Sequence, residues 1–167
     1  MVLSLIILVY FLGEAVSDTF CPDTWVADRG SCYLFNPDRA SNYADARQYC
    51  SQHNGHLVVV NDVHENKFLK DFLRRLKPMG WWIGLTDELV EGEWLWYPKN
   101  EAPEYKDWVP GEPNSNGGTL DEDCASMYLD DYHHDYQWVD VHCNQIHGPI
   151  CEREAGTDGN SGGGIIG

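Results

Sequence analysis

Six cysteines constrain the fold of this 167-residue chain more than any other feature of its sequence. An even number of cysteines in a chain of this size is typical of a disulfide framework in a secreted protein. No Cys-x-x-Cys pair occurs, which disfavours a zinc site built from thiolates. Spacing alone does not choose among the many pairings that six cysteines allow, so the connectivity stays open at this point.

The first residues of the chain indicate secretion. An apolar run extends from Val2 to Leu12, and Ala15 and Ser17 are small residues of the kind that a signal peptidase reads. The run is too short to cross a bilayer, and no second long apolar run follows it. We therefore predict a signal peptide over residues 1–17, a secreted, extracellular protein, and no insertion into a membrane.

The charge of the chain narrows the classes of partner. The formal net charge is −16, and such an acidic surface disfavours nucleic acid and anionic membranes. Bound calcium is compatible with this charge because the ion would offset part of it. The acidity can also serve only to keep a secreted protein soluble, and composition does not separate these two interpretations.

Two segments have helical patterns. Residues 41–53 are predicted as a helix that Ser41 caps and that ends at Asn54-Gly55. Residues 62–76 are the clearer helix, with a capping-box-like start at Asp62 and Glu65. An apolar stripe runs along this second helix, and cations fill its C-terminal half as the helix dipole favours: Phe68, Leu69, Phe72, Leu73 and Leu76, then Lys70, Arg74, Arg75 and Lys77. The stripe predicts core packing.

Short β-branched or alternating runs predict strands, and two segments lack any pattern. The expected strands cover residues 56–60, 82–85, 94–96, 124–129, 137–141 and 148–152. Residues 98–122 are rich in Pro, Gly, Asn and acidic side chains, and an unpatterned segment of this length is usually functional. Residues 155–167 are predicted as a flexible Gly/Ser tail.

Four oxygen-bearing side chains stand in two groups near two of the cysteines: Glu112, Asn114, Glu122 and Asp140, with Cys124 and Cys143. If these cysteines pair, the four side chains can converge, and calcium takes about 6–8 oxygen ligands. A cis bond before Pro113 would turn the backbone sharply and aim both flanking side chains at one point. An acidic loop that binds no ion is the alternative interpretation.

These motifs resemble those of the C-type lectin domain family. Mannose-type members carry Glu-Pro-Asn, Glu-Asp-Cys and Trp-Asn-Asp, where this chain has Glu112-Pro113-Asn114, Glu122-Asp123-Cys124 and Trp138-Val139-Asp140. The run Trp82-Ile83-Gly84-Leu85 is similar to a central motif of the family. The resemblance implies an α+β C-type lectin fold over residues 18–154, with two helices flanking small antiparallel sheets and a long calcium-binding loop region. It also implies three disulfides, Cys21–Cys32, Cys50–Cys151 and Cys124–Cys143, and an N-terminal hairpin over residues 20–35.

The resemblance further implies how the site works. One calcium ion would lie among Glu112, Asn114, Glu122 and Asp140, which would also hydrogen-bond two neighbouring sugar hydroxyls. Glu-Pro-Asn implies a preference for mannose, glucose, fucose or N-acetylglucosamine. The side chains implied for an auxiliary calcium are Asp87, Glu91 and Asp123, with Ser115 or Asn116 at a further ligand position.

One residue departs from the family pattern. Val139 offers no oxygen to calcium and no donor to a sugar, whereas the family's asparagine supplies both. The departure predicts weaker calcium binding and weaker sugar selectivity. Trp108 and the tyrosines of residues 128–136 are candidates to flank a sugar ring.

The leading hypothesis is a secreted, calcium-dependent lectin that binds glycans on microbial or host glycoconjugates in innate immune recognition. The alternative is a structural protein that uses the same fold with weakened or absent sugar binding, in a mineral matrix or in contact with proteins or ice. No Gly-x-Ser-x-Gly, His-Glu-x-x-His or phosphate-loop motif is present, so no enzyme activity is predicted. An oligomer is possible but not indicated, because the sequence has no collagen-like repeat or heptad run.

Overall fold

The computed structural model describes residues 19–115, 121–130 and 135–157. The predicted signal peptide and residues 158–167 of the predicted tail lie outside this part. Within it, no helix combines the length and the apolar character that crossing a membrane requires.

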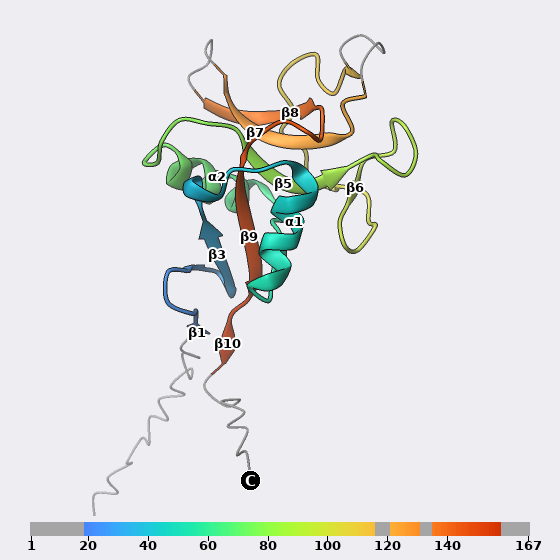
Figure 1. Ribbon diagram of the computed structural model, residues 1–167. Helices are drawn as coiled ribbons and strands as arrows, with labels where there is room; N and C mark the ends of the chain where they lie inside the picture. Colours follow the sequence, from blue (N-terminus) through green and yellow to red (C-terminus); the bar gives the residue numbers. More distant parts are fainter. Residues whose placement is uncertain (1–18, 116–120, 131–134, 158–167) are drawn as a thin grey trace, which may run out of the picture.

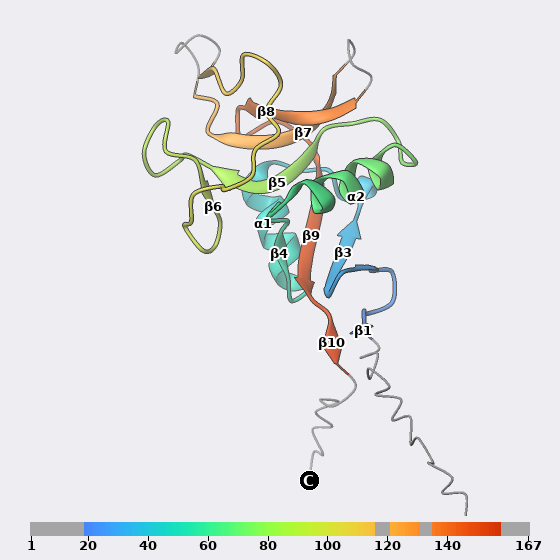
Figure 2. The same cartoon turned by 180° about the vertical axis from the view of Figure 1, so that it is seen from behind.

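The two ends of the described chain lie side by side. β1 (Thr19–Phe20) pairs antiparallel with β10 (Gly156–Thr157), below the rest of the domain in Figures 1 and 2. The tail predicted to begin at residue 155 is therefore corrected, because Gly156 and Thr157 belong to a strand. A glycine gives no side-chain signal for this pairing, which uses the backbone alone.

The expected N-terminal hairpin is present. β2 (Val26–Asp28) and β3 (Ser31–Phe35) pair antiparallel, and Gly30 turns between them with a positive φ of 89°. A short 3₁₀ helix, η1 (Pro37–Arg39), follows β3.

Helix α1 (Tyr43–Gln52) begins later than the sequence predicted. Asn42, rather than Ser41, is its N-cap, and the Asn42 side chain accepts a hydrogen bond from the amide of Asp45 at 2.8 Å. Ser41 instead pairs with the backbone of His147 in both directions, at 3.0 and 3.1 Å. Asparagine and serine cap helices about equally well, so the tertiary bridge at Ser41 decides the start of the helix.

Helix α2 (Val63–Leu73) has the predicted cap but ends three residues early. Oδ1 of Asp62 accepts hydrogen bonds from the amides of His64 and Glu65 at 2.7 and 2.9 Å. Glu65 reaches back to the amide of Asn61 rather than to the cap itself. Leu69 and Leu73 of the predicted stripe are fully buried, as core packing requires.

The remaining strands form one mixed sheet with the hairpin. They are β4 (His56–Leu57), β5 (Trp81–Thr86), β6 (Leu95–Trp96), β7 (Cys124–Asp130), β8 (Asp135–Val141) and β9 (Gly148–Glu154). The order is β2-β3-β9-β5-β7-β8, with β4 beside β9 and β6 beside β5. α1 packs on β9 and β4, while β7 and β8 form the upper layer in Figure 1.

The fold class is confirmed, with two corrections of detail. The pairing of β5 with β9 is parallel, so the sheet is not purely antiparallel. The predicted strand over residues 56–60 stops at Leu57, although Val58 still bonds to the backbone of Ile150 and Gly84. Val58, Val59 and Val60 are buried, so their β-branched run indicates burial in the core and not membership of a strand.

All three expected disulfides are present: Cys21–Cys32, Cys50–Cys151 and Cys124–Cys143. The second joins residues 101 positions apart and fixes α1 to β9. Closing a loop of that length contributes about 4.7 kcal/mol in the chain-entropy model.

Candidate functional site

The candidate site lies on the long loop that the sequence predicted. Between β6 and β7, the described residues 97–114 and 121–123 contain no helix or named strand. This loop is fixed to β8 by two backbone hydrogen bonds, Val109 N to Trp138 O at 2.8 Å and Trp138 N to Asp107 O at 2.9 Å. The β8 backbone therefore sets where the loop enters the site.

A buried lysine ties the same loop to α2. Nζ of Lys70 lies 2.5 Å from Oδ2 of Asp107 and 3.1 Å from Oδ2 of Asp135. Asn66 donates to Oδ2 of Asp107 at 2.7 Å and accepts a bond from the indole of Trp138 at 3.2 Å. Lys70 was expected only to favour the helix dipole, and the structure instead gives it an ion-pair role that depends on contacts distant in sequence.

Glu112, Asn114 and Asp140 converge in the structure. The Glu112–Pro113 bond is cis, and the side-chain amide of Asn114 donates to the carboxylate of Glu112. Oδ2 of Asp140 accepts hydrogen bonds from the backbone amides of Asn114 and Ser115 at 2.8 and 2.6 Å. The carboxylate from β8 thus holds the turn after Pro113 in place.

The electrostatics of this group favour a cation. Burial raises the pKa of Glu112 from 4.5 to about 7, and the neighbouring carboxylates of Asp140 and Glu122 contribute to the shift. Glu122, the fourth predicted calcium ligand, therefore also lies close to Glu112. Asp140 is only 4% exposed, and its Oδ1 has no hydrogen-bond partner in the described residues. Crowded carboxylates with an unpaired buried oxygen are a donor set that suits calcium, since a hard cation takes carboxylate and carbonyl oxygens.

Val139 lies between two buried β8 residues, Trp138 and Asp140, and is itself half-buried. Its side chain packs against the hydrophobic cluster that contains Cys124 and Val141. It therefore adds apolar packing where the family pattern has an amide.

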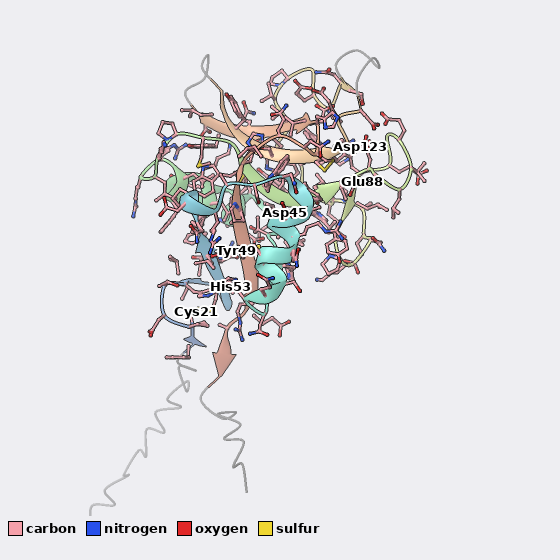
Figure 3. The ribbon with its side chains drawn as sticks, viewed as in Figure 1. Cys21, Asp45, Tyr49, His53, Glu88 and Asp123 are labelled. Atoms are coloured by element: carbon pink, nitrogen blue, oxygen red, sulfur yellow. A yellow bond between two sulfur atoms is a disulfide. The ribbon has the colours of Figure 1, made fainter. Side chains whose placement is uncertain are left out.

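The predicted auxiliary ligands also lie close together. Carboxylate oxygens of Glu91 and Asp123 gather within 4.8 Å of one another and of a third residue, Asp121, which the sequence reasoning left out. The position of Asp121 directly before Glu122-Asp123 is the sequence feature that could have identified it. Figure 3 shows Asp123 near Glu88, at the end of the molecule away from Cys21.

Asp87 lies beside this group but is buried. It is 3% exposed, its Oδ2 accepts from the amide of Gly92 at 2.8 Å, and its Oδ1 has no hydrogen-bond partner in the described residues. Burial, with Glu91 and Asp123, raises the pKa of Asp87 from 3.8 to about 6. Burial and the neighbouring Asp121 also raise the pKa of Asp123.

Ser115 connects the two carboxylate groups. Its backbone amide donates to Asp140, and its hydroxyl donates to Oε1 of Glu91 at 2.8 Å. Ser115 and Asn116 were the two candidates for a further ligand after the Glu-Pro-Asn motif. The structure places Ser115 beside the auxiliary carboxylates, and Asn116 lies outside the described residues.

The aromatic residues predicted to flank a sugar ring differ in how exposed they are. The ring of Trp108 packs edge-on against Trp94 and Trp138, with centroids 4.9 and 5.8 Å away, and is partly buried against the core. Tyr136 is buried, whereas Tyr128 is 48% exposed. Tyr132 lies outside the described residues.

Comparisons with known proteins agree with this geometry. A profile described as the lectin C-type domain matches residues 39–153. Human asialoglycoprotein receptor 2 is 35% identical over 145 residues, which cover 84% of this chain but only 43% of the receptor. Perlucin from Haliotis laevigata is 33% identical over 135 residues, which cover 80% of this chain and 83% of perlucin.

Solved structures give the same result. The carbohydrate-recognition domain of cow CD23, determined in the presence of a GlcNAc2Man3 oligosaccharide, has a TM-score of 0.71 and 34% identity and covers 83% of this chain and 98% of that domain. A calcium-independent type II antifreeze protein has a TM-score of 0.69 and 26% identity, covering 82% of this chain and 96% of that protein. With this profile match, the three disulfides and a long loop that gathers Glu112, Asn114 and Asp140, the chain belongs to the C-type lectin domain family.

Proposed function

We propose that this protein is a secreted, calcium-dependent carbohydrate-binding protein of the mannose, glucose, fucose and N-acetylglucosamine type. The observation that carries the proposal is the buried carboxylate of Asp140, with one oxygen on the loop amides and the other without a partner in the described residues. An unpaired buried carboxylate oxygen costs free energy, and a bound cation would offset that cost.

Four side chains would hold calcium in this proposal: Glu112, Asn114, Glu122 and Asp140. Calcium would supply coordination positions for two neighbouring hydroxyls of one sugar. The carboxylates would accept hydrogen bonds from those hydroxyls, and the Asn114 amide would donate one. Asp87, Glu91, Asp123 and Asp121 would hold an auxiliary calcium, whose role would be to fix the loop through the Ser115–Glu91 contact.

The order of Glu112 and Asn114 supports the mannose-type preference, and Val139 supports weak affinity. Biological partners in this proposal are glycans of microbial or host glycoconjugates, bound in innate immune recognition and without catalysis. Weak single sites reach a higher overall affinity on clustered glycans when several sites are linked, because each further binding event is then intramolecular.

Retention on mannose–agarose in calcium, with elution by a chelator, tests the proposal. Galactose–agarose is the comparison column, and the paired variant Glu112→Gln/Asn114→Asp is expected to move retention from the first column to the second. Retention on neither column in calcium, or retention that a chelator does not reverse, would contradict a calcium-dependent sugar site.

A second candidate is a C-type lectin-like structural protein, a matrix component or a binder of proteins or mineral, with weak or absent sugar binding. Val139, which packs as an apolar residue at the site, favours it. The similarity to perlucin over most of both chains, and to a type II antifreeze protein, also supports this second candidate. A glycan array with and without chelator separates the candidates, since only the first predicts calcium-dependent binding to defined sugars.

A further inference from the structure

Positive charge is concentrated on α2 and the turn that follows it. Five of the eleven lysines and arginines of the chain lie within residues 67–77, although the net charge is −16. Lys70 is buried in its ion pairs, so the solvent-facing cations are Lys67, Arg74, Arg75 and Lys77. In Figure 1, α2 lies at the left of the molecule and the loop that follows β6 at the right.

An open depression of about 610 Å³ lies between this helix and the β2–β3 turn. Its lining residues are Asp28, Arg29, His64, Lys67, Phe68, Asp71 and Arg75. That volume is within the range of small-ligand sites. It shares no lining residue with the candidate calcium site.

Ion pairs inside the depression leave two cations over. Arg29 pairs with Asp28 and Asp62, each at 3.3 Å, and Asp71 pairs with Arg74 at 2.5 Å. Lys67 and Arg75 have no ion pair or hydrogen bond with any described side chain. They stand on either side of Asp71 along the chain and line the same wall. Three cations and two carboxylates line the depression, so with His64 neutral an anionic ligand would meet a net charge of +1, with Lys67 and Arg75 as its unpaired cations.

Phe68 gives the depression an apolar surface between these cations. Its ring is partly buried against Tyr33, with centroids 5.0 Å apart, and still lines the depression. An aromatic wall beside two cations suits a ring-shaped ligand that carries negative groups. We propose that this depression binds an acidic saccharide, one that bears sulfate or carboxylate groups, and that it does so without calcium.

A thin saccharide fits this site better than two other anions. A second copy of the chain would bring its own net charge of −16 and would be repelled. A saccharide is thin, so it interacts mainly with the protein charges that lie within a Debye length, about 8 Å at physiological salt. Duplex nucleic acid carries a negative charge about every 1.7 Å and needs a long row of cations. Two unpaired cations match a few saccharide units instead.

The test is titration of the full-length protein with a heparin hexasaccharide in the presence of a chelator. Lys67→Ala/Arg75→Ala is compared with Lys99→Ala/Lys106→Ala, which removes the same charge from two exposed lysines elsewhere. We expect about tenfold weaker binding for the first double variant and no change for the second. Asp71→Asn is expected to strengthen binding, because it removes a negative charge from the wall.

Two further ligands identify the chemistry that is recognised. A hyaluronan hexasaccharide offers carboxylates alone, and a neutral dextran hexasaccharide is expected not to bind. Equal losses in both double variants, equal binding of dextran, or binding only when calcium is present would overturn the proposal. So would self-association of the protein that Lys67→Ala/Arg75→Ala abolishes, since the depression would then serve a second copy. None of these results depends on whether the calcium site binds mannose.

Discussion

Asp140 on β8 accepts a hydrogen bond from the backbone amide of Asn114, 26 residues earlier in the chain, at 2.8 Å. One carboxylate oxygen therefore holds the loop while the other remains buried and without a partner in the described residues. Since Glu112 lies close enough for Asp140 to raise its pKa, the site concentrates negative charge at a point the backbone has already fixed.

Asp140→Asn is expected to abolish most of the stabilisation by calcium. The amide keeps an oxygen for the loop amides but loses the charge, and a ligand that binds only the folded state at 100 times its Kd adds about 2.7 kcal/mol. Thermal melting with calcium and with chelator measures this, with Glu101→Gln as an exposed control. In chelator the variant should be at least as stable as the parent, because repulsion of Glu112 is relieved. A calcium-induced rise in Tm as large as that of the parent would rule out Asp140 as a ligand.

Val139→Asn is expected to strengthen both calcium and mannose binding. Asparagine has nearly the volume of valine and adds a carbonyl for the ion and an N–H for a hydroxyl. A hydrogen bond to a charged group contributes about 1.5–3 kcal/mol, which corresponds to roughly a 10- to 150-fold gain. Calorimetry measures both affinities. Val139→Thr loses similar apolar packing but gains no amide, so an equal effect in both variants would contradict the expectation.

Lys70→Met is expected to destabilise the fold by about 2–3 kcal/mol. Breaking a fully buried ion pair costs about 3–5 kcal/mol, and the cost is smaller here because the side chains of Asp107 and Asp135 are 21% and 32% exposed. Urea unfolding measures the loss. Adding Asp107→Asn should restore part of the stability, since Asp107 has no other ion pair in the described residues, whereas Asp135 keeps its pair with Arg74. A double variant no more stable than Lys70→Met would show that packing, and not charge, makes Lys70 important.

His147 is expected to make the fold less stable below pH 6.5. Its ring is 5% exposed and packs edge-on against Trp82, and burial lowers its pKa from 6.5 to about 4. The unfolded chain therefore binds a proton near pH 6.5 that the folded chain binds only near pH 4. Stability that is present above pH 6.5 is lost as the pH falls through this window, by up to about 3 kcal/mol.

Unfolding of the parent and of His147→Phe at several pH values isolates this contribution, because the carboxylates are common to both proteins. The difference in unfolding free energy between them should change as the pH falls from 7.5 to 5, in favour of the variant. His53→Phe, at an exposed ring, is the control for replacing a histidine by phenylalanine. A pH-independent difference for His147→Phe would mean that the histidine has the same pKa in the folded and the unfolded chain, which would contradict the expectation.

Local patterns in the sequence were sufficient for several features. Two leucines of the stripe on α2, Leu69 and Leu73, are fully buried as predicted, and the Asp62 cap lies where its spacing placed it. The three disulfides followed from the family resemblance and not from spacing. Glu112, Asn114 and Asp140 could be selected because their residue types and their places around Pro113 and Cys143 carry the chemistry directly.

Other features depended on partners distant in the chain. Ser41 and Asn42 are comparable caps, and the bridge from Ser41 to His147 decides between them. The sequence shows that Trp108 is an aromatic residue near the site, but only the structure shows that one edge of its ring packs against Trp94 and Trp138.

The sequence by itself determined the even number of cysteines, the two amphipathic helices and the residue types available to a calcium site. These are local properties, since periodicity, capping and ligand chemistry are carried by the residues themselves. Only the tertiary structure decided that Lys70 is a buried ion-pair centre, that Asp121 joins the auxiliary carboxylates, and that Lys67 and Arg75 remain unpaired beside Phe68. A charge acquires its role from the groups that folding brings within a few ångströms of it, and those groups come from distant parts of the chain.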